Sequence, residues 1–237
     1  MLTAFLQSVS GGLYEGDRLA TRLEFGEGAQ AHVTTQGATV AHAMPHRGEA
    51  RHDVTIRAAG GSLAEYLPDP LILLPTASVR SRVCVEADIG ATVILGDAFL
   101  THDPEARRRP FHRFASEVSL RRPSGALIAL ERFDISGGEA EAAWRALLPR
   151  PCSAQGTVWV CSPHPSAELA DALSSALAGV PSLCAGASTL PGQAGAVARL
   201  LAPDAVALAS GFRTAWCALR HVLIGATPDG RRKSGWL

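Results

Sequence analysis

The chain has 237 residues, of which 47% are hydrophobic and only 5% aromatic, and its 22 basic residues balance its 22 acidic residues. A chain of this length can bury a sizeable core, and here that core must be mainly aliphatic. The balanced charge gives no electrostatic reason to expect nucleic acid or an anionic membrane as a partner.

The amino terminus, MLTAFLQSVSGG, has no basic region and no long apolar core, so the sequence predicts no signal peptide. No uninterrupted apolar run reaches membrane-spanning length. The five cysteines are odd in number and contain no CxxC pair. Together these features favour a cytoplasmic protein with reduced thiols.

The first part of the chain repeats a strand-turn-strand pattern. Apolar and polar residues alternate over 19–25 and again over 29–35, with a glycine turn between them. Turn glycines recur at Gly28, Gly61, Gly90 and Gly125, at spacings of 33, 29 and 35 residues. This loose period favours a solenoid-like stack of β-hairpins, and an ordinary meander of hairpins in a sandwich is the alternative.

Polar loops interrupt these repeats at 43–53 and 102–114, and we expect both to be exposed and able to meet partners. His42, His46 and His52 gather at the first loop, but Pro45 and Gly48 remove the helical meaning of their spacing. A solvated loop is therefore favoured over a metal site. The second loop carries Arg107–Arg109, to which the sequence assigns no role.

Composition changes near Gly137-Gly138, and a different pattern follows. Strands are expected at 157–161, 182–190 and 194–201, with one helix after Pro165 and a second that begins at Asp204 and ends at Gly225. We therefore expect a mainly β fold, α+β overall: a β-rich, repeat-like part, 1–137, and a β-α-β-β-α part, 150–237, packed against it as one integrated domain.

Common catalytic signatures are missing from the sequence. It contains no HExxH, no GxSxG and no zinc-type cysteine spacing. The only lysine is Lys233 and no GxxxxGK[ST] motif is present, so nucleotide hydrolysis by this chain is not expected. The letters Gly26-x-Gly28-x-x-Ala31 fit a dinucleotide fingerprint, but a strand follows them instead of a helix.

Three carboxylates stand out because of their neighbours. Asp97 lies in VILGDAFL, Glu131 in LIALERF, and Asp17 follows Gly16. A buried carboxylate costs several kcal/mol unless it is paired. One explanation is internal pairing, of Glu131 with Arg132 and of Asp97 with a backbone turn. The other is an interior polar path, whose oxygen donors would hold a divalent cation weakly enough to release it.

Several motifs in register resemble those of the urease accessory protein D family, also called H in some bacteria. SGGLYEGDRL resembles the family's PPGG-[IL]-x-GGD-x-L, with Glu15 replacing the first glycine of the GGD. Further similar segments follow in order: TTQGAT, LAEYLPDPLI, LGD, LERF, CAGAS and Trp216–Gly225. The family's K-x-Y-R-S is replaced by Val40–Met44, and members usually carry a longer stretch ahead of the first motif.

The resemblance implies a non-enzymatic maturation factor with a mainly β fold and two helices. Such proteins bind apo-urease and the accessory F protein, and through F the GTPase accessory G. They help deliver nickel through an internal passage and hold no tightly bound cofactor. On this basis Asp17, Asp97 and Glu131 are the predicted contacts for transient nickel.

Two alternatives remain open at this point. A β-solenoid carbohydrate-active hydrolase would need two carboxylates facing one cleft, about 5–10 Å apart. A purely structural adaptor would share the fold and partners and would not handle metal.

Overall fold

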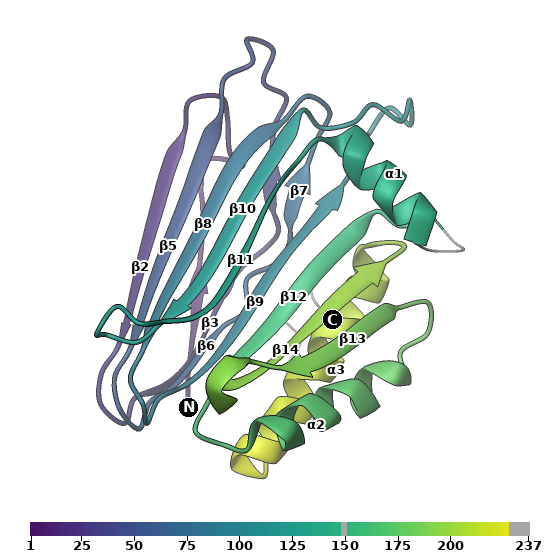
Figure 1. The fold of residues 1–237 in the computed structure, drawn as a ribbon. Helices are drawn as coiled ribbons and strands as arrows, with labels where there is room; N and C mark the ends of the chain where they lie inside the picture. Colours follow the sequence, from purple (N-terminus) through teal and green to yellow (C-terminus); the bar gives the residue numbers. More distant parts are fainter. Residues whose placement is uncertain (148–150, 228–237) are drawn as a thin grey trace.

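The computed structural model describes residues 1–147 and 151–227, in which two β-sheets lie face to face (Figure 1). Sheet A has the order β1-β3-β6-β9-β12-β14-β13, with β4 and β7 beside it. Its strands are β1 Leu2–Leu6, β3 Gln30–Thr35, β4 Thr39–Ala41, β6 Leu63–Tyr66, β7 Leu71–Leu73, β9 Thr92–Thr101, β12 Ala154–Cys161, β13 Cys184–Thr189 and β14 Gly195–Ala202. Sheet B has the order β11-β10-β8-β5-β2. Its strands are β2 Arg18–Phe25, β5 Ala50–Ala58, β8 Ser78–Ala87, β10 Arg113–Arg121 and β11 Leu127–Ile135.

The repeats form coils of a solenoid. In three of them the chain runs up a strand of sheet B, turns, and returns in sheet A, as β2 to β3, β5 to β6 and β8 to β9. Each strand therefore pairs in parallel with the equivalent strand of the next coil. The turns stack as well, because Gly28 N donates to Gly60 O (3.1 Å) and Gly61 N to Gly90 O (3.0 Å). The solenoid-like stack is confirmed, and only the fourth repeat, β10–β11, is an antiparallel hairpin.

The last part of the chain has the predicted β-α-β-β-α order. Strand β12 pairs antiparallel with β9, so sheet A continues from the solenoid into this part without a break. Helices α2 (Ser166–Ala178) and α3 (Ala205–Ile224) cover the outer face of the sheet (Figure 1). Both predicted caps of α3 are confirmed: the Asp204 side chain accepts from Ala207 N, and Gly225 adopts a left-handed conformation with φ 65°.

A third helix, α1 (Gly137–Leu147), forms at the change of composition, where the sequence predicted no helix. A capping box starts it, in which Ser136 N donates to Glu139 and Glu139 N donates to Ser136 Oγ. Among the described side chains of this helix, those of Ala140 and Trp144 are the buried ones, which are too few to reveal a periodic apolar face. Residues 148–150 and the single lysine, Lys233, lie outside the described residues. No helix in the described ranges is long and apolar enough to cross a membrane.

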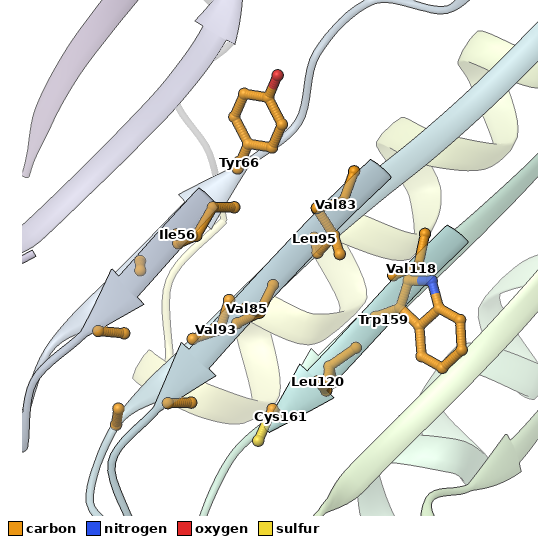
Figure 2. Close-up of a cluster of buried hydrophobic side chains, with 14 of the residues drawn as sticks. Ile56, Tyr66, Val83, Val85, Val93, Leu95, Val118, Leu120, Trp159 and Cys161 are labelled. Carbon is orange, nitrogen blue, oxygen red and sulfur yellow. The ribbon is translucent and has the colours of Figure 1, made fainter. Parts of the chain in front are cut away.

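The space between the sheets is filled at one end by aliphatic side chains. Figure 2 shows this core, where Val83 and Val118 of sheet B meet Leu95 and Trp159 of sheet A. An aromatic cluster around Phe99 fills the other end. The candidate site lies between these two cores.

Candidate functional site

A row of polar side chains crosses the inner face of sheet B. His52, Ser81 and Ser116 are register partners on β5, β8 and β10, and cross-strand partners share a face. Both serines are buried. The next partner, on the edge strand β2, is Leu19, which is 42% exposed. The polar row therefore runs from the open edge of the sandwich into its interior.

A cavity of about 740 Å³ lies along this row, between the two sheets. His52 and Ser81 line it on one side, and Tyr66, Asp69 and Asp97 line it on the other. Exposed side chains of β1 and β2, Phe5 and Leu19, also line the cavity. It therefore opens to solvent at the edge formed by these two strands.

Asp97 stands at the inner end of the cavity. It points between the sheets because its neighbours at alternate positions, Leu95 and Phe99, belong to the two inter-sheet cores. Ser116 Oγ donates to Asp97 Oδ2 at 3.4 Å. Burial, and then the negative charge of Glu131, raise the pKa of Asp97 to about 6. Burial and the charge of Asp97 likewise raise the pKa of Tyr66.

The raised pKa of Asp97 predicts a pH-dependent stability. The folded state binds this proton more tightly than the unfolded chain, whose aspartate has its ordinary pKa of 3.8. Stability should therefore fall as pH rises from about 4 to about 6, and the penalty should persist above that range. We expect Asp97→Asn to raise the free energy of unfolding at pH 8 by about 1–3 kcal/mol, the lower values reflecting water in the cavity.

Urea unfolding of both proteins at pH 4, 6 and 8 measures this effect. Asp171→Asn is the matched control, because it removes the same charge from an exposed position on α2, away from the residues that line the cavity. An Asp97→Asn protein that is less stable than the wild type at pH 8 would contradict the assignment.

Glu131 lies on the edge strand β11 of sheet B and reaches across to sheet A. Its carboxylate accepts from Arg199 Nη2 of β14 at 2.8 Å. The alternative pairing with Arg132 does not occur, because Arg132 pairs with Glu117 on the outer face of sheet B (2.6 Å). Asp97 likewise bonds Ser116, not a backbone turn. The structure thus brings Asp97 and Glu131 near each other, since the charge of one shifts the pKa of the other.

Asp17 occupies a different environment. Its carboxylate accepts from Tyr14 N at 2.8 Å, and its own N–H donates to Tyr14 O at 3.1 Å. It therefore caps a tight turn ahead of β2, and it is not among the residues that line the cavity. A role for Asp17 in contacting nickel stays a prediction.

Two cavity residues were not singled out as site residues from the sequence. Asp69 is 7% exposed and is positioned by a bond from its N–H to Thr35 Oγ1 (2.9 Å). The sequence predicts a loop at His52, but β5 already begins at Ala50, so His52 lies on a strand and faces the cavity. Burial lowers the pKa of His52, which keeps its imidazole neutral and able to donate a lone pair. The available signal in the sequence was the spacing of His52, two residues before the apolar Val54, which places both side chains on the same face of a strand.

The other sequence features do not join this site. His42 stacks on Tyr14 (4.4 Å) and bonds Gly11 O, and His46 is exposed. The second loop is held by its own charges, since Arg109 pairs with Asp103 (2.9 Å) and Glu105 (3.0 Å). That pairing also lowers the pKa of Asp103.

The donors around the cavity are spread out. Within residues 1–147 and 151–227, no three His, Cys, Asp or Glu side chains converge to hold a metal ion. The indole N–H of Trp159, a residue only 2% exposed, finds no hydrogen-bond partner in these same ranges. Buried donors without protein partners are commonly satisfied by water. This chemistry fits a hydrated interior with single oxygen and imidazole donors.

Comparison with known proteins identifies the family. The family described as UreD urease accessory protein matches residues 1–234. Urease accessory protein UreD 1 of Pseudomonas syringae pv. tomato is 37% identical over 233 residues, covering 98% of this chain and 81% of that protein. UreD 1 of Methylorubrum extorquens (35% identical, 98% and 78%) and UreD 3 of Bradyrhizobium sp. ORS 278 (33%, 98% and 81%) are similar over the same extent. The chain therefore belongs to the UreD family of urease accessory proteins, non-catalytic factors of urease maturation.

Proposed function

We propose that this protein helps deliver nickel to urease by passing the ion through the hydrated space between its sheets. The observation that carries the proposal is Asp97, an inward-facing carboxylate at the end of a cavity that is open to solvent at its other end. His52 and Asp69 supply further donors along the way. Nickel is the cargo of this passage and would not be retained as a tightly bound cofactor.

The donor set suits transfer better than storage. Oxygen and imidazole donors bind divalent nickel, and isolated donors release it more readily than a closed multi-ligand site would. Because a carboxylate must lose its proton to hold a cation, protons compete with nickel at Asp97 as the pH approaches 6. Asp97 is thus ionised, and available to nickel, under neutral conditions.

We further propose that the protein scaffolds the maturation complex. It would bind apo-urease and the accessory F protein, and recruit the GTPase accessory G through F. The missing GxxxxGK[ST] motif supports a division of labour in which the G protein hydrolyses nucleotide. A cytoplasmic location is part of this proposal, since the five cysteines are all free thiols.

Of the two alternative functions, the hydrolase is excluded and the structural adaptor is not. The carbohydrate-active hydrolase is wrong, because the chain belongs to a family of non-catalytic maturation factors. A structural adaptor that does not handle metal is also compatible with membership of this family. Only nickel measurements on cavity variants distinguish it from the nickel passage.

Expression of the tagged chain in a strain that lacks its own UreD gene tests the scaffold. We expect urease subunits and the F and G proteins to co-purify with the chain, and urease activity to return. A strain that expresses the accessory F and G proteins without the chain serves as the control. Purification of the folded chain alone, with no return of urease activity, would contradict the scaffold.

A further inference from the structure

We infer that the passage continues beyond Asp97 along a second polar row, across sheet A, and that the ion pair between Arg199 and Glu131 is the gate that closes its outlet. This inference rests on the proposed nickel passage, because the gate controls the same path.

The second row begins at Asp97 itself. Asp97, Thr157 and Arg199 are register partners on β9, β12 and β14, so their side chains share the inner face of sheet A. Thr157 is buried, at 5% exposure. The next partner, on the last strand β13, is Gly186, which has no side chain to block the way. Three strand spacings of about 4.8 Å make this row about 14 Å long.

An apolar row lies beside this polar row. Leu95, Trp159 and Val197 are register partners two residues away on the same strands, and all three belong to the aliphatic core. A threonine and an arginine inside such a face cost free energy unless they are hydrated or paired. The indole N–H of Trp159, which has no partner in the described ranges, lies in the adjoining row and adds a reason for water there.

The gate sits where the sandwich ends. Strand β11 is the last strand of sheet B, whereas sheet A continues through β12, β14 and β13 (Figure 1). The ion pair spans this free edge: the Glu131 side chain is 16% exposed, and the Arg199 side chain is 59% exposed. The carboxylate therefore faces the interior and the guanidinium faces solvent.

The charges explain how the gate would work. While Arg199 holds Glu131, its positive charge repels a cation that approaches the outlet, and the carboxylate is occupied. A divalent cation at Asp97 attracts Glu131 from the inside and competes with Arg199 for it. Once Glu131 turns to the cation, Arg199 is free to swing into solvent and the outlet opens.

Thiol labelling at Thr157→Cys tests the gate in the purified full-length protein, because residue 157 lies between Asp97 and Arg199. The probe is a small cationic methanethiosulfonate, and tandem mass spectrometry locates its attachment among the native cysteines. Arg199→Met should speed labelling at residue 157 about tenfold, as expected when one charge-assisted hydrogen bond that opposes opening is lost. Arg132→Met is the matched control, since it removes an exposed ion pair from the outer face of β11.

Equal labelling rates in the Arg199→Met and Arg132→Met proteins would overturn the gate. Thermal unfolding checks that each variant is folded, and Glu131→Gln, which breaks the same pair with little change of shape, replaces Arg199→Met if that variant unfolds. Labelling involves no nickel, so its result is independent of the passage itself. If the passage itself were wrong, urease matured with the Asp97→Asn protein would contain as much nickel as urease matured with the wild type.

Discussion

Replacing Glu65 with alanine is expected to lower the free energy of unfolding by about 3–5 kcal/mol, the usual cost of removing one partner from a buried ion pair. Glu65 lies on β6 and is 0% exposed, beneath helix α3. Its Oε1 accepts from Arg220 Nε (2.8 Å), and its Oε2 accepts from Trp216 Nε1 (3.0 Å) and His32 Nδ1 (2.9 Å). The substitution would leave the Arg220 guanidinium, whose side chain is only 13% exposed, without its counter-charge.

Urea unfolding followed by circular dichroism measures this loss. The matched control is Glu168→Ala, which removes a carboxylate 64% exposed on α2 from its pair with His164. An exposed pair of this kind contributes at most about 1 kcal/mol. Equal losses in the two variants would show that the Glu65 cluster does not hold α3 on the sheet.

This cluster gives a structural role to Trp216–Gly225, the last segment that resembles the family's motifs. Trp216 and Arg220 lie one turn apart on α3, so both reach Glu65 from the same helix face. His32 also stacks on Trp216, with ring centroids 4.7 Å apart. These residues fasten the helix to sheet A and lie away from the cavity-lining set.

The sequence revealed the repeats but left their pairing open. Gly28 and Gly61 mark turns because both adopt positive φ, at 65° and 68°. Alternating strands fit a hairpin and a solenoid coil equally well, since both bury one face with a period of two. The choice depends on which strand lies alongside, and that is settled by packing between coils 30 or so residues apart.

The site was visible only in part for the same reason. Asp97 stood out because a carboxylate in an apolar strand is costly. Asp17 carried a similar signal, yet the four-residue turn from Tyr14 to Asp17 accounts for its carboxylate. Thr157 and Arg199 look like ordinary strand residues, and only the register with Asp97 reveals the row that they form.

The second large effect concerns nickel delivery. We expect Asp97→Asn to lower the nickel content of urease about tenfold, which is the lower end of what losing a supporting carboxylate costs a metal site. Asparagine keeps the shape and the bond from Ser116 but cannot carry the negative charge that attracts the cation. Because this variant should be more stable at neutral pH, a loss of nickel could not be explained by unfolding. Asp171→Asn, at an exposed position on α2 away from the cavity lining, should leave delivery unchanged.

The most direct test is therefore the number of nickel ions per urease active site, measured by elemental analysis of urease purified with the Asp97→Asn protein. Equal recovery of urease with the wild-type and variant proteins must be verified in the same preparations. We predict a nickel content about tenfold below that obtained with the wild type. Full nickel occupancy with the complex intact would contradict the interior passage and leave the structural adaptor as the function of this chain.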